Sequence, residues 1–116
     1  MSERKWVPVS KVMRTEVTHV DGRITVLEAL RIMKRDKITS LIVNKRFDND
    51  EYGLLLFADV AKQVIAMDRS PERVNVYEIM TKPVISVRPD MDIRYCARLF
   101  SNSGISHAPV IDGEKV

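Results

Sequence analysis

The feature that most constrains the fold of this sequence is an internal repeat with a period of 67 residues. Residues 11–20 align with residues 78–87 at this spacing, and the alignment runs without a gap to Val43 and Val110. Apolar positions agree throughout. The identical pairs are Met13 with Met80, Val17 with Val84, Val20 with Val87, Arg31 with Arg98, Ile38 with Ile105 and Val43 with Val110. The chain is therefore predicted to contain two copies of one supersecondary unit that pack against each other.

Each copy is predicted to run from a short turn that carries a methionine into a strand, a helix and a second strand. The first strands are expected at residues 17–20 and 84–87. A helix follows each, because apolar residues recur at i, i+3, i+4 and i+7 and form one stripe. Thr25 and Asp92 are candidate N-caps, and Gly104 marks the end of the second helix. The stripe residues are Val26, Ala29, Leu30 and Met33 in the first copy and Ile93, Cys96, Ala97 and Phe100 in the second.

The second strands are expected at residues 40–43 and 108–111, and after them the copies differ. The first copy continues with a polar loop at 44–52, a strand at 54–57 and a helix at 59–67. The second copy ends within the turn that would precede its third strand. It should therefore present an open sheet edge and an uncovered face, which either a longer natural chain or a partner would cover.

These boundaries divide the chain into repeat 1, residues 7–70, and repeat 2, residues 71–116, which lacks its final strand and helix. A chain of 116 residues can bury one shared core, whereas two separate cores of about fifty residues would each be marginal. The two repeats are therefore expected to pack together as one α/β module.

The composition narrows the classes of function. Apolar residues make up 45% and charged residues 30% of the chain, and no apolar run approaches the roughly 20 residues that span a bilayer. The start at Met1 reads as natural and carries no secretory core, so a cytoplasmic protein without a membrane segment is expected. The net charge of +3 is interleaved in sign, which argues against a dedicated nucleic-acid binder.

The sequence shows no pattern typical of catalysis or of a metal site. The two histidines, His19 and His107, lie 88 positions apart, and no HExxH, P-loop or GxGxxG pattern occurs. The single cysteine, Cys96, allows no internal disulfide and no cysteine zinc site. Residues 48–51 look faintly like a calcium loop but lack its glycine and its closing glutamate, so they are interpreted as a solvated hairpin tip. The chain is therefore not expected to be an enzyme.

Three kinds of segment, taken together, point to a known family. A Val-Met or Ile-Met pair opens the copies at residues 12–13 and 79–80, residues 105–112 surround a second strand, and residues 53–59 run from a glycine to an aspartate. In order, spacing and duplication these segments resemble the CBS repeat, the module named after cystathionine β-synthase. The resemblance implies two β-α-β-β-α repeats related by a pseudo-twofold axis, which form a Bateman module that commonly pairs into a dimer.

The resemblance also implies a ligand site between the repeats. In the family, one repeat supplies a carboxylate that accepts hydrogen bonds from the ribose hydroxyls of a nucleotide, and Asp59 matches it. An ionised acceptor suits that role, although Asp59 would also be favoured in the first turn of its helix without any ligand. The family has a serine or threonine where this chain has Leu56, which cannot hold the ribose-phosphate. The residues matched to the ligand are Asp59, Lys82, Pro83, Val84, Ser106, His107 and Pro109.

The remaining matched residues each have a structural alternative. Lys82 is a candidate phosphate cation, or else a solvated surface lysine. Ser106 and His107 match positions that touch phosphate in many family members, and His107 could instead be a structural histidine. Pro83 and Val84 would wall the base, while Pro109 also fits a turn into a strand.

Three functions remain open from the sequence. The resemblance favours a regulatory module that senses AMP, ADP or ATP, with S-adenosylmethionine and NAD as second choices, and that acts on a separate protein. That role requires no cofactor. Leu56 and the incomplete second repeat favour instead a ligand-free module that only dimerises. Nucleic-acid binding through mild basicity is the third and weakest alternative.

Overall fold

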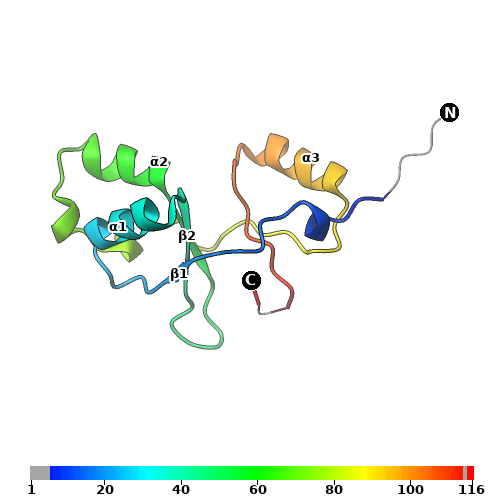
Figure 1. Cartoon of the computed structure of the whole chain (residues 1–116), viewed down its shortest axis with the longest axis horizontal. Helices are drawn as coiled ribbons and strands as arrows, with labels where there is room; N and C mark the ends of the chain where they lie inside the picture. Colours follow the sequence, from blue (N-terminus) through cyan, green and yellow to red (C-terminus); the bar gives the residue numbers. More distant parts are fainter. Residues whose placement is uncertain (1–5, 114) are drawn as a thin grey trace. The chain divides into compact units, whose positions relative to one another are not determined.

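The structure, a computed structural model, describes residues 6–113 and 115–116. Its chain forms two compact units, which are described separately (Figure 1). Unit 2 is Glu16–Val84, and unit 1 joins the described part of Met1–Thr15 to Ile85–Val116. The units cut across the sequence repeats, because the opening residues of each repeat belong to the unit built around the other repeat.

Unit 2 contains a three-stranded sheet in the order β1-β2-β3, in which β1 runs parallel and β3 antiparallel to β2. Helix α1 connects the two parallel strands, and α2 follows β3 directly. The elements are β1 (His19–Val20), α1 (Val26–Asp36), β2 (Ser40–Val43), β3 (Gly53–Leu56), α2 (Phe57–Val60), the π-helix η2 (Ala61–Ile65), and the 3-10 helices η3 (Pro71–Arg73) and η4 (Val76–Glu78).

Helix α1 forms where the apolar stripe predicts it. The Thr25 side chain accepts a hydrogen bond from the backbone N–H of Glu28 at 3.2 Å, which satisfies one of the unpaired donors at the helix start. The helix ends at Lys37, whose left-handed backbone (φ 55°) lets its N–H donate to the carbonyl of Met33. The buried stripe residues are Val26, Ala29 and Met33.

Replacing Thr25 with alanine should lower the free energy of unfolding by about 0.5–2 kcal/mol, because the N–H of Glu28 loses its acceptor. Urea denaturation followed by circular dichroism measures this loss. Thr39→Ala is the matched control, because Thr39 is exposed and its side chain makes no described hydrogen bond; it should change stability by less than about 0.5 kcal/mol. Equal unfolding midpoints for the Thr25 variant and the wild type would contradict the capping role.

Two elements of unit 2 begin or end at residues other than those predicted from the sequence. The strand expected at residues 17–20 pairs with β2 only at His19–Val20, because Val17 lies outside the paired stretch and is 44% exposed. The helix expected at 59–67 begins at Phe57 and continues as the π-helix Ala61–Ile65. The sequence pattern located both elements, but their ends depend on pairing partners that lie far along the chain.

The principal buried core lies within unit 2. Its side chains come from the sheet, from α1, from the α2–η2 helix and from the segment around η4. The members are Val20, Val26, Ala29, Met33, Leu41, Val43, Leu55, Val60, Val64, Val74, Val76 and Ile79. All of these residues lie in unit 2, but Val74, Val76 and Ile79 belong to repeat 2 and the other nine to repeat 1, so both repeats contribute to this core as expected.

Unit 1 is built around α3 (Ile93–Ser103), and it also contains the 3-10 helix η1 (Val9–Lys11). As the sequence predicts, Asp92 caps α3 by accepting a hydrogen bond from the N–H of Arg94 at 3.0 Å. Gly104 ends the helix with a φ of 66°, a left-handed conformation that glycine adopts without steric cost.

The two strands expected in repeat 2, at 84–87 and 108–111, are reduced to one parallel bridge between Val87 and Val110. The N–H of Val87 donates to the carbonyl of Pro109 at 3.0 Å. Pro109 has no N–H with which to extend a ladder, and the described part of unit 1 holds no counterpart of β3. Both facts keep the pairing short.

The apolar face of α3 is less covered than that of α1. Ile93, Cys96 and Phe100 are half-buried, whereas the residues 67 positions earlier in α1 are buried. In unit 2 that face packs with Leu55 of β3 and Val60 of α2, and the described part of unit 1 has no such elements. Among the described residues, the apolar face of α3 is therefore less covered than that of α1, and the prediction of an uncovered face stays a prediction.

In unit 1, the opening segment of repeat 1 docks on the body of repeat 2. The N–H of Val9 donates to the carbonyl of Met91 at 2.8 Å, and the N–H of Ile93 donates to the carbonyl of Val7 at 2.9 Å. An isolated antiparallel bridge lies between these bonds. Residues 7–11 thus behave as a short strand that enters a 3-10 turn.

In unit 2, the opening segment of repeat 2 docks on the body of repeat 1 by the equivalent bonds. The N–H of Val76 donates to the carbonyl of Ile24 at 2.9 Å, and the N–H of Val26 donates to the carbonyl of Val74 at 2.8 Å. Each of these residues lies 67 positions from its equivalent in unit 1. The repeat found in the sequence is therefore also a repeat of backbone hydrogen bonds, with the opening segments exchanged.

Candidate functional site

Asp59 lies in the first turn of α2, immediately after β3, and is half-buried. Its Oδ2 accepts a hydrogen bond from the backbone N–H of Leu56 at 3.3 Å. No other hydrogen bond to this carboxylate occurs among the described residues. Asp59 therefore stabilises the start of its helix, as the structural alternative requires, and still has an oxygen with which to accept a bond from a ligand.

Leu56 is the last residue of β3 and the N-cap of α2, with an extended backbone (φ −106°, ψ 147°). Serine and threonine are preferred at such a position because their hydroxyl accepts from the backbone N–H groups of the first turn. Leu56 supplies no hydroxyl, either to the helix or to a ligand. The departure from the family pattern is therefore located at the point where β3 meets the helix that carries Asp59.

Lys82 forms an ion pair, contrary to the alternative that it is a solvated surface lysine. Its Nζ lies 2.7 Å from Oδ2 of Asp50, and the two side chains are 17% and 7% exposed. The same Oδ2 accepts bonds from the backbone N–H and the Nε of Arg46, at 2.9 Å and 3.1 Å. The interpretation of residues 48–51 as a solvated hairpin tip is therefore wrong for Asp50.

The hydrogen bond from Lys82 holds the pKa of the Asp50 carboxyl well below its usual range, and the bonds from Arg46 act in the same direction. Asp50 is therefore ionised at neutral pH. Because its pKa in the folded state is lowered, the contact stabilises the fold above the ordinary carboxyl pKa of about 3.9. That contribution is lost as the pH falls through the lowered pKa.

The segment that contains Lys82 is bonded to the free edge of β3. The N–H of Leu54 donates to the carbonyl of Thr81, and the N–H of Thr81 donates to the carbonyl of Leu54. Both bonds measure 2.9 Å. Next to this pair, Gly53 leaves room for the Met80 side chain: a Cβ at Gly53 would lie 2.8 Å from the Met80 sulfur. Backbone pairing, packing and the ion pair thus fix residues 80–82 against residues 50–54.

The antiparallel register separates Lys82 from Asp59. Since Thr81 pairs with Leu54, Lys82 lies beside the start of β3, whereas Asp59 follows the end of the strand. A four-residue strand rises about 10 Å from its first residue to its last. Along β3, the backbone positions that lie beside Lys82 and Asp59 are therefore separated by about the length of the strand.

The other matched residues differ in exposure. Pro83 is exposed and follows a cis peptide bond, and the half-buried Val84 ends unit 2. In unit 1, Ser106 and His107 are exposed and in contact, with Oγ and Nδ1 2.8 Å apart. Pro109 is buried, and its carbonyl accepts from Val87, which is the structural role that the sequence left open.

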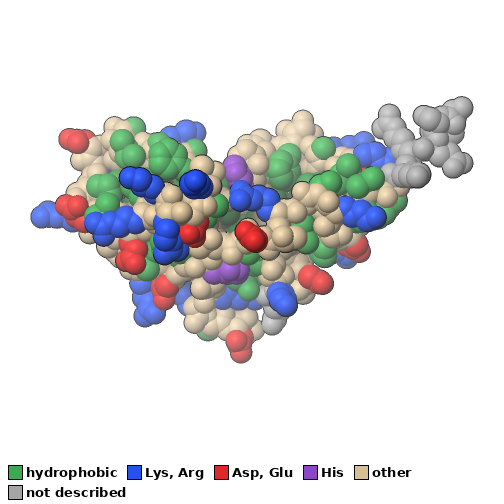
Figure 2. All heavy atoms as spheres, viewed as in Figure 1, with side chains coloured by type: hydrophobic (Ala, Val, Ile, Leu, Met, Phe, Trp, Pro, Cys, Tyr) green, Lys and Arg blue, Asp and Glu red, His purple; other side chains and the backbone are tan. Residues whose placement is uncertain are grey.

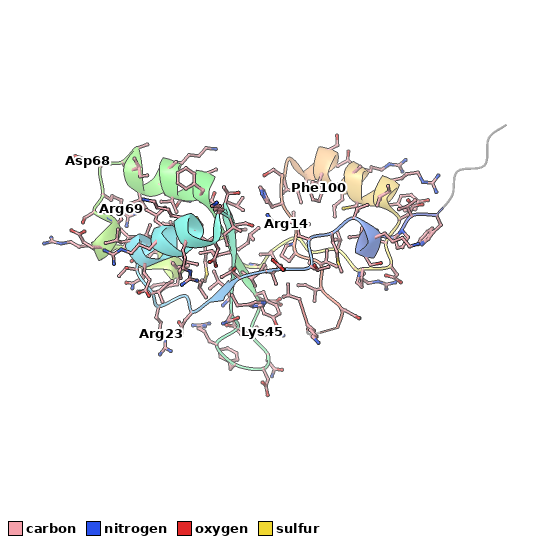
Figure 3. All side chains as sticks on the ribbon, viewed as in Figure 1. Arg14, Arg23, Lys45, Asp68, Arg69 and Phe100 are labelled. Carbon is pink, nitrogen blue, oxygen red and sulfur yellow. The ribbon has the colours of Figure 1, made fainter. Side chains whose placement is uncertain are left out.

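A second polar cluster gathers at the carboxyl ends of β1 and β2. Nδ1 of His19 lies 2.9 Å from Oδ1 of Asn44, and its ring meets the Tyr52 ring edge-on at 6.4 Å. Lys45, labelled in Figure 3, places its ammonium 5.1 Å from the centre of the Tyr52 ring. Sequence reasoning treated His19 alone and missed this cluster, because its members are far apart along the chain.

The charged surface shows interleaved signs. Lys and Arg side chains alternate with Asp and Glu side chains on the face seen in Figure 2. Two arginines labelled in Figure 3 form ion pairs: Arg23 with Asp21 at 2.8 Å, and Arg69 with Glu78 at 3.7 Å. Exposed pairs of this kind add little stability, but they neutralise the basic charge locally.

Among the residues that the structure describes, no three His, Cys, Asp or Glu side chains are grouped so that they could hold a metal ion. The helices of that same part of the chain are all too short or too polar to cross a membrane.

Comparison of the sequence with known families identifies the family to which the chain belongs. The family model described as "CBS domain" matches residues 9–65 and 76–116. The chain belongs to the CBS domain family. Its two matched segments make it a CBS pair, a regulatory module with the β-α-β-β-α repeat fold, and proteins with CBS domains are generally regulatory and not catalytic.

Solved structures share the fold of this CBS pair. It is 37% identical, with a TM-score of 0.90, to a hexameric CBS-CP12 protein from bloom-forming cyanobacteria, and the match covers 93% of this chain and 62% of that one. A CBS domain pair solved with 5′-methylthioadenosine and S-adenosyl-L-methionine is 23% identical, with a TM-score of 0.80, over 96% of this chain and 85% of that one. The second likeness shows the fold alone.

Among curated proteins, the CBS pair is 36% identical over 106 residues to a homoserine O-acetyltransferase from Methanosalsum zhilinae. That match covers 91% of this chain and 20% of the relative. Another curated relative is covered over 54% of its length. The chain thus spans from about a fifth to about half of these relatives.

Proposed function

We propose that this CBS pair is a cytoplasmic sensor that binds an adenosine-type ligand and transmits its binding to a separate protein. The carrying observation is Asp59, a half-buried carboxylate at the β3–α2 junction with an oxygen that no described residue occupies. A ribose offers two hydroxyl donors, and an ionised acceptor binds such donors more strongly than a neutral one. AMP, ADP, ATP, S-adenosylmethionine and NAD all carry that ribose and are the candidate ligands.

The other proposed ligand residues are Lys82, Pro83 and Val84 in unit 2 and Ser106 and His107 in unit 1. Ser106 and His107 are exposed and could donate to a ligand tail. Pro109, also proposed as a ligand residue, would act by holding the strand that follows them.

Replacing Asp59 with alanine should weaken the binding of an adenosine ligand by about 1.5–3 kcal/mol, or roughly 10- to 150-fold, because the ribose loses a charged acceptor. Isothermal titration with each candidate ligand measures the change. Asp59→Asn keeps an oxygen that can accept from Leu56, so it separates the loss of charge from damage to the helix start. Asp48→Ala, in the exposed part of the loop, is the control. Unchanged affinity in both Asp59 variants would remove Asp59 from the site.

Leu56 favours a second candidate function, a ligand-free CBS module that only pairs with a second copy. In that case the half-buried apolar face of α3 would contribute to the contact, and a specific interface would bury more than about 1,000 Å². Light scattering should then show a homodimer at tens of micromolar, and no adenosine ligand should raise the melting temperature. A ligand that binds and raises it would by itself exclude this alternative.

A further inference from the structure

The structure shows how the charge of Lys82 is used. Three donors converge on Oδ2 of Asp50: Nζ of Lys82 at 2.7 Å and two nitrogens of Arg46 at 2.9 Å and 3.1 Å. Because the side chain of Asp50 is only 7% exposed and that of Lys82 only 17%, water competes little for this contact. The ammonium of Lys82 is therefore already neutralised by a carboxylate of the same unit.

A phosphate that approached Lys82 would also approach Asp50. The phosphate would have to share the ammonium with the carboxylate or displace it, and it would meet a second negative charge at close range where solvent screening is weak. Displacing Asp50 would leave a carboxylate without its partner in a poorly solvated place. Leu56 removes a further donor, the hydroxyl that other family members offer. Lys82 therefore attracts an anionic tail less than an unpaired lysine would, and the other cation on Asp50, Arg46, is exposed and screened by water.

We propose that Asp50 is a specificity-determining residue, which makes the site prefer adenosine ligands with a neutral or cationic tail over nucleotides with several phosphates. This inference rests on the proposed function. Asp50 acts through Lys82 and through its own negative charge, so it needs no contact with the ribose. The register of Thr81 with Leu54 agrees with this assignment, because Lys82 lies a strand length from Asp59, where only the tail of a ligand would reach.

The test compares the affinities of adenosine and ATP by isothermal titration at constant ionic strength, in the full chain. In Asp50→Asn, Lys82 is released, and the ratio of ATP affinity to adenosine affinity should rise at least about tenfold, the effect of one poorly screened charge. In Lys82→Met, Asp50 keeps only its bonds from the exposed Arg46, so its charge is less compensated and the ratio should fall. Asp48→Asn, which removes an exposed charge from the same loop, should leave the ratio unchanged.

The double variant Asp50→Asn, Lys82→Met covers the case in which Asp50→Asn alone does not fold, because it removes both charges of the buried pair and leaves only the exposed Arg46 without its partner. Its ratio should exceed that of Lys82→Met by at least about tenfold, since only the carboxylate differs between the two. An unchanged ratio in both comparisons, with adenosine still bound, would overturn the role of Asp50 and leave the proposed function standing. Failure of the wild type and the double variant to bind either ligand would overturn both.

Discussion

A fragment of residues 16–84 is expected to fold on its own, whereas a fragment of residues 1–70, of nearly the same length, is expected to remain unfolded. The first fragment is unit 2 and keeps every member of the principal buried core. The second follows the repeat boundary in the sequence, and it loses the segment that docks on α1. Circular dichroism and the dispersion of amide resonances distinguish the two outcomes.

The size of this effect follows from what residues 71–84 contribute. Val74, Val76 and Ile79 are 3%, 0% and 4% exposed and belong to the core. Burying such side chains contributes about 1.5–3 kcal/mol each, or about 5–9 kcal/mol together. That is comparable with the whole stability of a small domain, about 5–15 kcal/mol. The 1–70 fragment also leaves the N–H of Val26 without the carbonyl of Val74.

A variant of the first fragment provides the control for the second. Val76→Asp within residues 16–84 places a charge where the side chain is fully buried, so it should unfold the fragment. Native-like dispersion in the 1–70 fragment would show that repeat 1 is complete without the exchanged segment. That result would contradict the division into units.

Leu55→Ala is expected to lower the free energy of unfolding by about 2–5 kcal/mol, the range for removing a buried leucine and leaving a cavity. Leu55 is 0% exposed in the middle of β3 and belongs to the core with residues of α1 and of the exchanged segment. Urea denaturation gives the loss directly.

The neighbouring Leu56 provides a matched control, because it is the same residue type on the opposite face of β3 and is only half-buried. Leu56→Ala should therefore cost less than half as much as Leu55→Ala. Equal losses would mean that Leu55 is no more tightly packed than Leu56, and the register with β2 would have to be revised.

The candidate site was only partly accessible to sequence reasoning. The family pattern placed Asp59 at the start of α2, and the structure adds the bond from Leu56 that the helix dipole alone does not imply. The acidic loop signalled charge near residue 50, but no local pattern connects Asp50 to Lys82, which lies 32 positions later. An ion pair of this separation exists only because Thr81 pairs with Leu54.

The sequence by itself determined the repeat, the two longer helices, the start of each and the end of the second. Those features depend on contacts within a few residues: the apolar stripes, the caps at Thr25 and Asp92, and the turn at Gly104. The tertiary structure alone decided which body each opening segment joins. The two segments match each other in apolar pattern, so either could dock on either body as far as local chemistry is concerned. The tertiary structure places the opening segment of repeat 2 on the body of repeat 1, and this placement also pairs Lys82 with Asp50.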